Sequence, residues 1–183
     1  MKIGLALARL LIGVLFVGHG TQKLFGWFGG HGRAGTGQFF ESIGLAPGDR
    51  NAVAAGASEA TGGALIAAGL LTPVGASLIS GPMITAIRSV HAPNGPWVSN
   101  GGWEYNAVLL AAVFLIADVG PGDWSLDAAA GRDLSGPGWA IFQLAAAAAG
   151  SAAIMKAGEA AAGAGASPGG GAGDPATADA SPN

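Results

Sequence analysis

Ionisable and amide side chains recur near the ends of the apolar segments of this chain. His19, Gln22 and Lys23 close the first apolar run, and Glu59 lies inside the second. An imidazole titrates near neutral pH, and a carboxylate in apolar surroundings can pass a proton to a bound group. The other candidates come later in the chain: Arg88, His91, Glu104, Tyr105 and Asn106. Gathered in one place, these residue types could hold an oxygen-bearing ligand and move protons to or from it.

The segments that position these residues have the composition of membrane helices. Half of the 183 residues are hydrophobic and only 10% are charged, whereas a soluble domain carries about 25% charged residues. The run over 3–24 is apolar for roughly 20 residues, which is the length that crosses a bilayer. Further helices are expected over 51–71, over 73–91 with a kink at Gly81-Pro82, and over 104–119. The sequence therefore predicts an all-α membrane protein whose residues 3–130 form a bundle of four transmembrane helices.

Three further segments are predicted outside these four helices. A short amphipathic piece over 36–45 should place its phenylalanines on the membrane interface while Glu41 faces water. The apolar, alanine-rich run over 139–155 is expected to form a fifth transmembrane helix. Residues 157–183 are rich in Ala, Gly, Ser and Pro and contain no aromatic residue, so a disordered C-terminal tail is expected.

Threading the four helices up and down brings the candidate residues to one side of the membrane. The first and third helices end on the side where the second and fourth begin. Glu59 should lie roughly 12 Å below that side, at a rise of 1.5 Å per residue. Lys23 and Arg88 could then neutralise Glu59 and Glu104, which leaves two histidines free to titrate.

Each candidate also has a purely structural explanation. Lys23 near a helix end could be a snorkelling anchor, and the tryptophans could form an aromatic belt. Arg88 and His91 could complement the dipole of their helix. Glu59 could be paired with a cation for structure alone, and Arg9 could do the same with Asp118. The joint argument for a site is the convergence of several polar side chains on one side.

Composition also excludes several classes of function. The chain has no cysteine, which removes disulfides and thiolate metal sites. A net charge of −3 gives no basic footprint for nucleic acid. His19 and His91 stand alone without the spacing typical of metal or haem ligands, so neither metal nor haem is expected.

Several short stretches resemble the DoxX family of small bacterial membrane proteins, which is related to the DoxD-type subunits of thiosulfate:quinone oxidoreductase. The stretches are Arg9-Leu10-Leu11-Ile12-Gly13, Gly18-His19-Gly20-Thr21-Gln22-Lys23-Leu24-Phe25-Gly26-Trp27, Gly56-Ala57-Ser58-Glu59, Arg88-Ser89-Val90-His91, Gly101-Gly102-Trp103-Glu104-Tyr105-Asn106 and Gly120-Pro121-Gly122-Asp123-Trp124. Their order and spacing agree with the family over residues 3–130.

The resemblance implies a multi-pass bundle in the lipid bilayer of the bacterial cytoplasmic (inner) membrane. It also implies a redox role in quinone-linked, sulfur or oxidative-stress metabolism. Similar four-helix bundles handle quinols, which favours a quinone over other redox cofactors. Because the chain has neither cysteine nor a flavin motif, electrons would come from partner redox subunits or from a soluble substrate.

On this hypothesis each candidate residue has a role. His19 and His91 would donate hydrogen bonds to the quinone carbonyls, and Glu59 and Glu104 would relay protons. Lys23 and Arg88 would steady an anionic intermediate, and the remaining cofactor-binding candidates are Gln22, Tyr105 and Asn106.

The alternative function is a non-catalytic scaffold or chaperone that holds partner subunits in the membrane. A transporter is less favoured, because the chain shows no inverted repeat. Membrane orientation stays open: the distribution of Lys and Arg favours the candidate side in the cytoplasm, whereas Lys2 ahead of the first helix favours the opposite.

Overall fold

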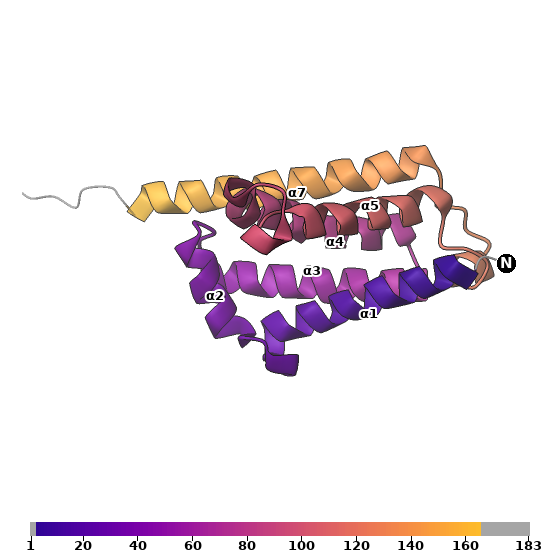
Figure 1. The fold of residues 1–183 in the computed structure, drawn as a ribbon, viewed down its shortest axis with the longest axis horizontal. Coiled ribbons are helices and arrows are strands. Elements are labelled where there is room, and N and C mark those ends of the chain that lie inside the picture. The colour runs from indigo at the N-terminus through magenta and orange to yellow at the C-terminus, as the bar shows by residue number, and fades with distance from the viewer. Residues whose placement is uncertain (1–2, 166–183) are drawn as a thin grey trace, which may run out of the picture.

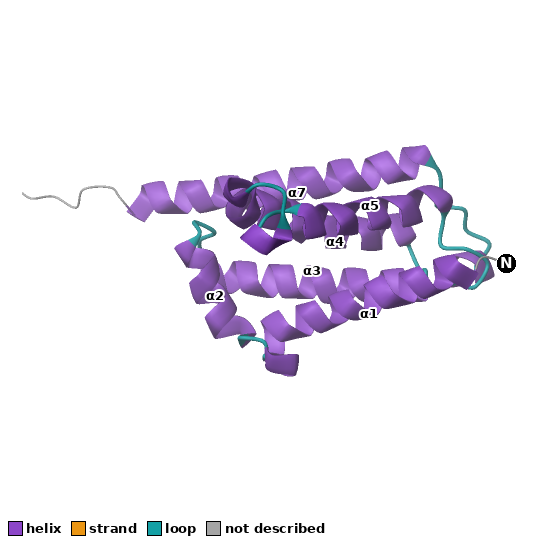
Figure 2. Ribbon diagram, in the orientation of Figure 1, coloured by secondary structure: helices purple, strands orange, loops and turns teal. Residues whose placement is uncertain are grey.

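The computed structural model describes residues 3–165, and every regular element in that range is helical (Figures 1 and 2). The helices are α1 (Ile3–Phe25), α2 (Gly32–Ser42), α3 (Gly48–Ala68), α4 (Thr72–Ala86), α5 (Glu104–Val119), α6 (Leu126–Ala129) and α7 (Pro137–Gly165). A π-helical turn over Ile87–His91 continues α4, and short 3-10 turns follow it. The expected helices are therefore all present, with bounds within a few residues of the predicted ones except at the C-terminal end of α7.

The long helices lie side by side, and α2 crosses one end of them (Figure 1). Helix α1 packs on α3, and α4 contacts α3, α5 and α7. The core is built from large apolar side chains of these helices, including Phe16, Ile66, Ile79, Val113 and Ile116. The end that carries α2 is called the α2 end below, and the opposite end is called the Arg9 end.

Glycines set the close approach of α1 to α3. A Cβ atom built on Gly13 would lie 2.5 Å from the carbonyl oxygen of Gly63, and one built on Gly20 would overlap the carbonyl oxygen of Gly56. Small residues allow helix backbones to come this close, as is common between membrane helices. The two glycine pairs therefore fix the register that sets the α1 side chains beside those of α3.

The proline inside α4 is accommodated by a hydroxyl from α3. Pro82 has no N–H, so the carbonyl of Leu78 loses its usual helical partner. Ser58 Oγ donates to that carbonyl oxygen at 2.7 Å. The helix continues through Pro82, and the irregularity appears instead as the π-helical turn that begins at Ile87. The kink expected at Gly81-Pro82 is thus displaced along the chain to a turn that ends at His91.

Arg9 and Asp127 hold the Arg9 end together. Arg9 is 3% exposed and donates to the carbonyl oxygens of Pro121 and Trp124, at 2.8 and 2.5 Å, rather than to Asp118. Asp127 is fully buried and accepts hydrogen bonds from the backbone N–H of Leu71, the backbone N–H of Thr72 and the Thr72 hydroxyl. A carboxylate at the N-terminus of α4 satisfies N–H groups that have no partner within the helix.

Within residues 3–165, two helices are long and apolar enough to cross a membrane, namely α1 and α7 over Pro137–Gly163. The run predicted as a fifth helix continues past 155 to Gly165, because alanine is the best helix former. Residues 157–165 of the expected tail are therefore helical, and the rest of that tail, 166–183, lies outside the described residues.

Candidate functional site

A cavity of about 970 Å³ lies toward the α2 end of the molecule. Residues of α1, α2, α3, α4, α5 and α7 line it, together with the turns after α4. The lining is mostly apolar, and six of the nine sequence candidates are among its polar residues: His19, Lys23, Glu59, His91, Tyr105 and Asn106. A large apolar pocket with a few converging polar groups is the usual form of a small-molecule site.

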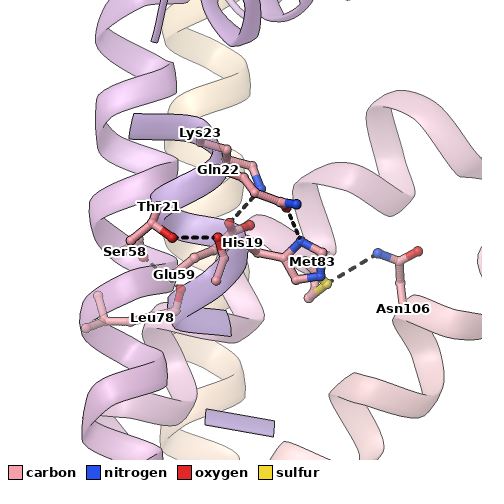
Figure 3. Close-up of polar contacts among 10 residues, drawn as sticks. His19, Thr21, Gln22, Lys23, Ser58, Glu59, Leu78, Met83 and Asn106 are labelled. Carbon is pink, nitrogen blue, oxygen red and sulfur yellow. Dashed lines mark hydrogen bonds and ion pairs between the residues drawn. The ribbon is translucent and has the colours of Figure 1, made fainter. Parts of the chain in front are cut away.

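An ion pair forms one polar wall of this cavity. Lys23 Nζ of α1 lies 2.6 Å from Glu59 Oε2 of α3 (Figure 3). The Glu59 side chain is 1% exposed and that of Lys23 is 25% exposed. A buried carboxylate is tolerated when an opposite charge lies this close. The expected neutralisation of Glu59 by Lys23 is therefore present, at the level where Gly20 and Gly56 bring the two helices together.

His19 is oriented by a chain of hydrogen bonds at the end of α1. Its Nδ1 lies 3.1 Å from Gln22 Oε1, while Gln22 Nε2 donates to the carbonyl oxygen of Phe28 at 3.3 Å. Phe28 stands in a left-handed backbone conformation, with φ of 52°. Gln22 does not line the main cavity. Its role is to hold the imidazole of His19, and His19 does line the cavity.

His91 is held by the loop that joins α4 to α5. It is the last residue of the π-helical turn, and its Nδ1 lies 2.7 Å from the carbonyl oxygen of Gly101. Asn94 Nδ2 donates to the same oxygen at 3.2 Å. The π-helical turn and this loop together place the imidazole of His91 in the cavity wall.

Asn106 and Tyr105 of α5 complete the polar lining. Asn106 is 7% exposed, and its Nδ2 donates to the Met83 sulfur at 3.3 Å (Figure 3). A thioether is a weak acceptor. The amide oxygen of Asn106 remains available to a ligand.

Two further candidates, besides Gln22, lie outside the cavity lining. Glu104 accepts a hydrogen bond from the backbone N–H of Val98 at 3.0 Å. It therefore stabilises the loop that joins α4 to α5 and does not line the cavity. Arg88 is exposed. Within residues 3–165 no ion pair joins it to Glu104. Arg88 lies in the π-helical turn and outside the cavity lining, which the spacing of Arg88 and His91 in the sequence does not reveal.

Helices α2 and α7 supply cavity residues that sequence reasoning missed. Phe39 and Phe40 of α2 line the cavity, and so do Ile43 and Leu45, which follow the helix. The α7 lining consists of small residues and one larger one: Ala146, Ala147, Gly150, Ser151 and Ile154. Small residues spaced four apart were the available signal on α7, but they are hard to distinguish in a run that is almost all alanine.

A second ion pair fastens α2 to the start of α3, outside the cavity. The Arg33 guanidinium donates two hydrogen bonds to the Asp49 carboxylate. These hydrogen bonds lower the pKa of Asp49 and raise the pKa of Arg33. Because both side chains are more than half exposed, the pair adds little stability.

Comparison with known proteins assigns the family. The family model described as DoxX matches residues 4–92. A curated protein of Bacillus subtilis (strain 168), named "Putative oxidoreductase CatD", is 34% identical over 114 residues, which cover 62% of this chain and 78% of that relative. The chain belongs to the DoxX family. No solved structure matches it.

DoxX proteins are membrane-associated, in agreement with the two long apolar helices. The part that matches the DoxX model runs from α1 to just after the π-helical turn, and it contains His19, Lys23, Glu59 and His91. Tyr105, Asn106 and the α7 lining lie beyond it.

Proposed function

We propose that this DoxX protein is a multi-pass protein of the bacterial cytoplasmic membrane that binds a quinone as a component of a quinone-linked oxidoreductase system. The system would serve sulfur or oxidative-stress metabolism together with partner redox subunits. The observation that carries the proposal is the single, mostly apolar cavity in which an ion pair, two imidazoles and an amide converge. The printed name of the Bacillus relative supports the oxidoreductase part.

The outer faces of the bundle favour a lipid environment. Leu7, Leu11 and Val14 of α1 are each about 60% exposed, and so is Ile141 of α7. Contiguous exposed apolar surface of this kind marks contact with lipid or with another protein. In the proposed arrangement residues 3–130 form the four-helix bundle, and α7 is a fifth transmembrane helix that closes the cavity.

The cavity residues suit the shape and polarity of a quinone ring. Aromatic and aliphatic side chains such as Phe16, Phe40 and Leu78 exclude water from most of the wall. The Lys23 ammonium has N–H groups beyond the one given to Glu59, and the Tyr105 hydroxyl can also donate. A bound quinone would supply chemistry of two electrons and two protons. Glu59, beside Lys23, is the group best placed to hold a proton next to such a ring.

A test can use the open space above Gly150. No atom lies within 4 Å of a Cβ built on this glycine, which lines the cavity. A Gly150→Phe substitution should therefore place a phenyl ring in the cavity, where it competes with a bound ring, without displacing α7. The adjacent Ala149 is exposed and lies outside the lining, so Ala149→Phe is the matched control.

The full chain would be extracted into native-lipid nanodiscs, and its bound quinone would be measured after solvent extraction. The wild-type protein and Ala149→Phe should retain quinone above the level of the surrounding lipid, and Gly150→Phe should lose at least about nine-tenths of it. Lipid-level quinone in the wild type, or full retention in Gly150→Phe, would overturn the proposal. The non-catalytic scaffold would then be the remaining function.

A further inference from the structure

The two cavity histidines are both held through Nδ1 by oxygen atoms that can only accept. Gln22 Oε1 faces His19 Nδ1, and the Gly101 carbonyl oxygen faces His91 Nδ1. An imidazole nitrogen beside an acceptor must carry the proton, and in a neutral imidazole the other nitrogen then has a lone pair and no hydrogen. Both rings therefore present Nε2 as a hydrogen-bond acceptor.

The surrounding contacts fix this assignment independently for each ring. The Gln22 amide cannot turn over without loss, because its Nε2 donates to the Phe28 carbonyl. A backbone carbonyl such as that of Gly101 has no donor form at all. Within the described part of the chain, neither Nε2 atom has a hydrogen-bond partner. Both atoms are therefore open to a donor, which is water in the empty cavity or a ligand when one is bound.

The other polar groups of the cavity strengthen the imbalance. Glu59 offers its second carboxylate oxygen, and Asn106 offers its amide oxygen, since Nδ2 is used on Met83. The hydroxyls of Ser58 and Thr85 line the cavity but donate to other protein oxygens. The donors left for a ligand are the Lys23 ammonium and the hydroxyls of Thr61, Ser89 and Tyr105. Hydroxyls accept as well as donate, so the groups that can only accept outnumber Lys23, the one group here that can only donate.

Quinones and hydroquinones differ in the hydrogen bonds that they can form with these cavity groups. The carbonyl oxygens of a quinone only accept, so they would face the Nε2 lone pairs without any shared hydrogen. The hydroxyls of a hydroquinone donate, and they can still accept from Lys23 or Tyr105. A ring that displaces water from these acceptors without donating to them leaves them unpaired, and that costs more than a hydrogen bond gains.

We infer that the cavity is built for the reduced ring: a hydroquinone binds with its hydroxyls donating to Nε2 of His19 and of His91. The inference rests on the proposed function, because it assumes that the cavity takes a quinone-type ring. It reverses the polarity expected from the sequence, in which the histidines donate to quinone carbonyls.

Binding of three ligands of nearly equal shape separates the possibilities. The probes are naphthohydroquinone, naphthoquinone and the dimethyl ether of naphthohydroquinone, titrated anaerobically into the full chain in nanodiscs. Naphthohydroquinone should bind about tenfold more tightly than either of the others, because only it donates hydrogen bonds. Binding of none of the three would overturn the proposed function. Equal affinities, or tighter binding of naphthoquinone, would overturn this inference and leave the proposed function standing.

Substitution of single histidines assigns the acceptors. His19→Phe and His91→Phe should each weaken the binding of naphthohydroquinone by about threefold to tenfold. The affinity for naphthoquinone should stay within a factor of two of the wild-type value. His31→Phe is the matched control, since His31 lies outside the lining of this cavity. An equal loss of affinity for all three ligands in His19→Phe and His91→Phe would contradict a donor–acceptor role for the imidazoles.

Nitrogen NMR tests the protonation pattern without any ligand. The chain has only three histidines, so ¹⁵N-histidine spectra can be assigned with the same three variants. At a pH where the rings are neutral, His19 and His91 should show the form with hydrogen on Nδ1. Gln22→Leu should release His19 into a mixture of tautomers while the His91 signals stay unchanged. Signals of the form with hydrogen on Nε2 in the wild-type protein would overturn the inference.

Discussion

Glu59 keeps a carboxylate inside an apolar wall because Lys23 lies 2.6 Å away. Removing a charge from water costs several kcal/mol, and a partner charge at short distance repays part of that cost. The arrangement is therefore sensitive to the loss of one member and tolerant of the loss of both. It also places a titratable group beside a cavity, which is where a proton-transfer group is useful.

A double-substitution cycle measures this sensitivity. Lys23→Met should lower the free energy of unfolding by about 3 kcal/mol, because it leaves the Glu59 carboxylate buried without a partner. The combination of Lys23→Met with Glu59→Gln should recover most of that loss. The readout is chemical denaturation in mixed detergent micelles. A double variant that shows the sum of the two single losses would contradict the coupling of these residues.

At the scale of helices, the α1–α3 contact positions the ion pair. Gly13 and Gly20 of α1 face Gly63 and Gly56 of α3 so closely that no Cβ fits between the backbones. The contact of α4 with α3 is fixed in another way: the Ser58 hydroxyl of α3 donates to the carbonyl oxygen of Leu78, one helical turn before Pro82. The α1–α3 contact sets the depth of Glu59 relative to Lys23, and the α4–α3 contact places the π-helical turn that ends at His91.

Two glycines of α1 give a matched pair of substitutions. Gly20→Ala should reduce the free energy of unfolding by about 1–3 kcal/mol, since the added methyl must push α3 away. Gly18→Ala has open space around its Cβ and should be neutral or stabilising by up to about 1 kcal/mol, because alanine favours the helix. Thermal unfolding of both variants in the same micelles is the measurement. Equal effects would show that the α1–α3 contact is looser than its geometry indicates.

On the scale of the whole molecule, the helices and the gathering of polar residues at one end were predictable from the sequence. The bounds of α5 follow from an apolar run closed by Gly120, and the grouping of His19 with Glu59 follows from antiparallel threading. The direction of the histidine hydrogen bonds was not predictable, because it depends on how Gln22 reaches Phe28 and how His91 meets Gly101. Arg88 and Glu104 lie outside the cavity lining, in a π-helical turn and beside a loop whose geometry the spacing of residues does not reveal.

The same arrangement predicts the membrane sidedness of the chain. The C-terminal ends of α1 and α7 both lie toward the α2 end, whereas the loop between α6 and α7 lies at the Arg9 end (Figure 1). Basic residues concentrate toward the α2 end: Lys23, Arg33, Arg50, Arg88 and Lys156. The positive-inside rule then places that end in the cytoplasm.

Reporter fusions check this arrangement. Reporters active only in the cytoplasm should be active after Gly30 and after Gly165, and inactive when inserted after Gly131. Opposite sidedness after Gly30 and Gly165 would contradict a membrane-spanning α7.

The residues that line the cavity come from two parts of the chain, and this division bears on how relatives can differ. The segment shared with the family ends at residue 92, and it holds both imidazoles and the ion pair. Helices α5 and α7, which close the chamber, lie in the portion outside that match. In the quinone site proposed above, changes in α5 and α7 would alter one half of the chamber and leave the two imidazoles and the ion pair in place. Chimaeras that join the first half of this chain to the second half of a relative should acquire the relative's preference for ring substituents.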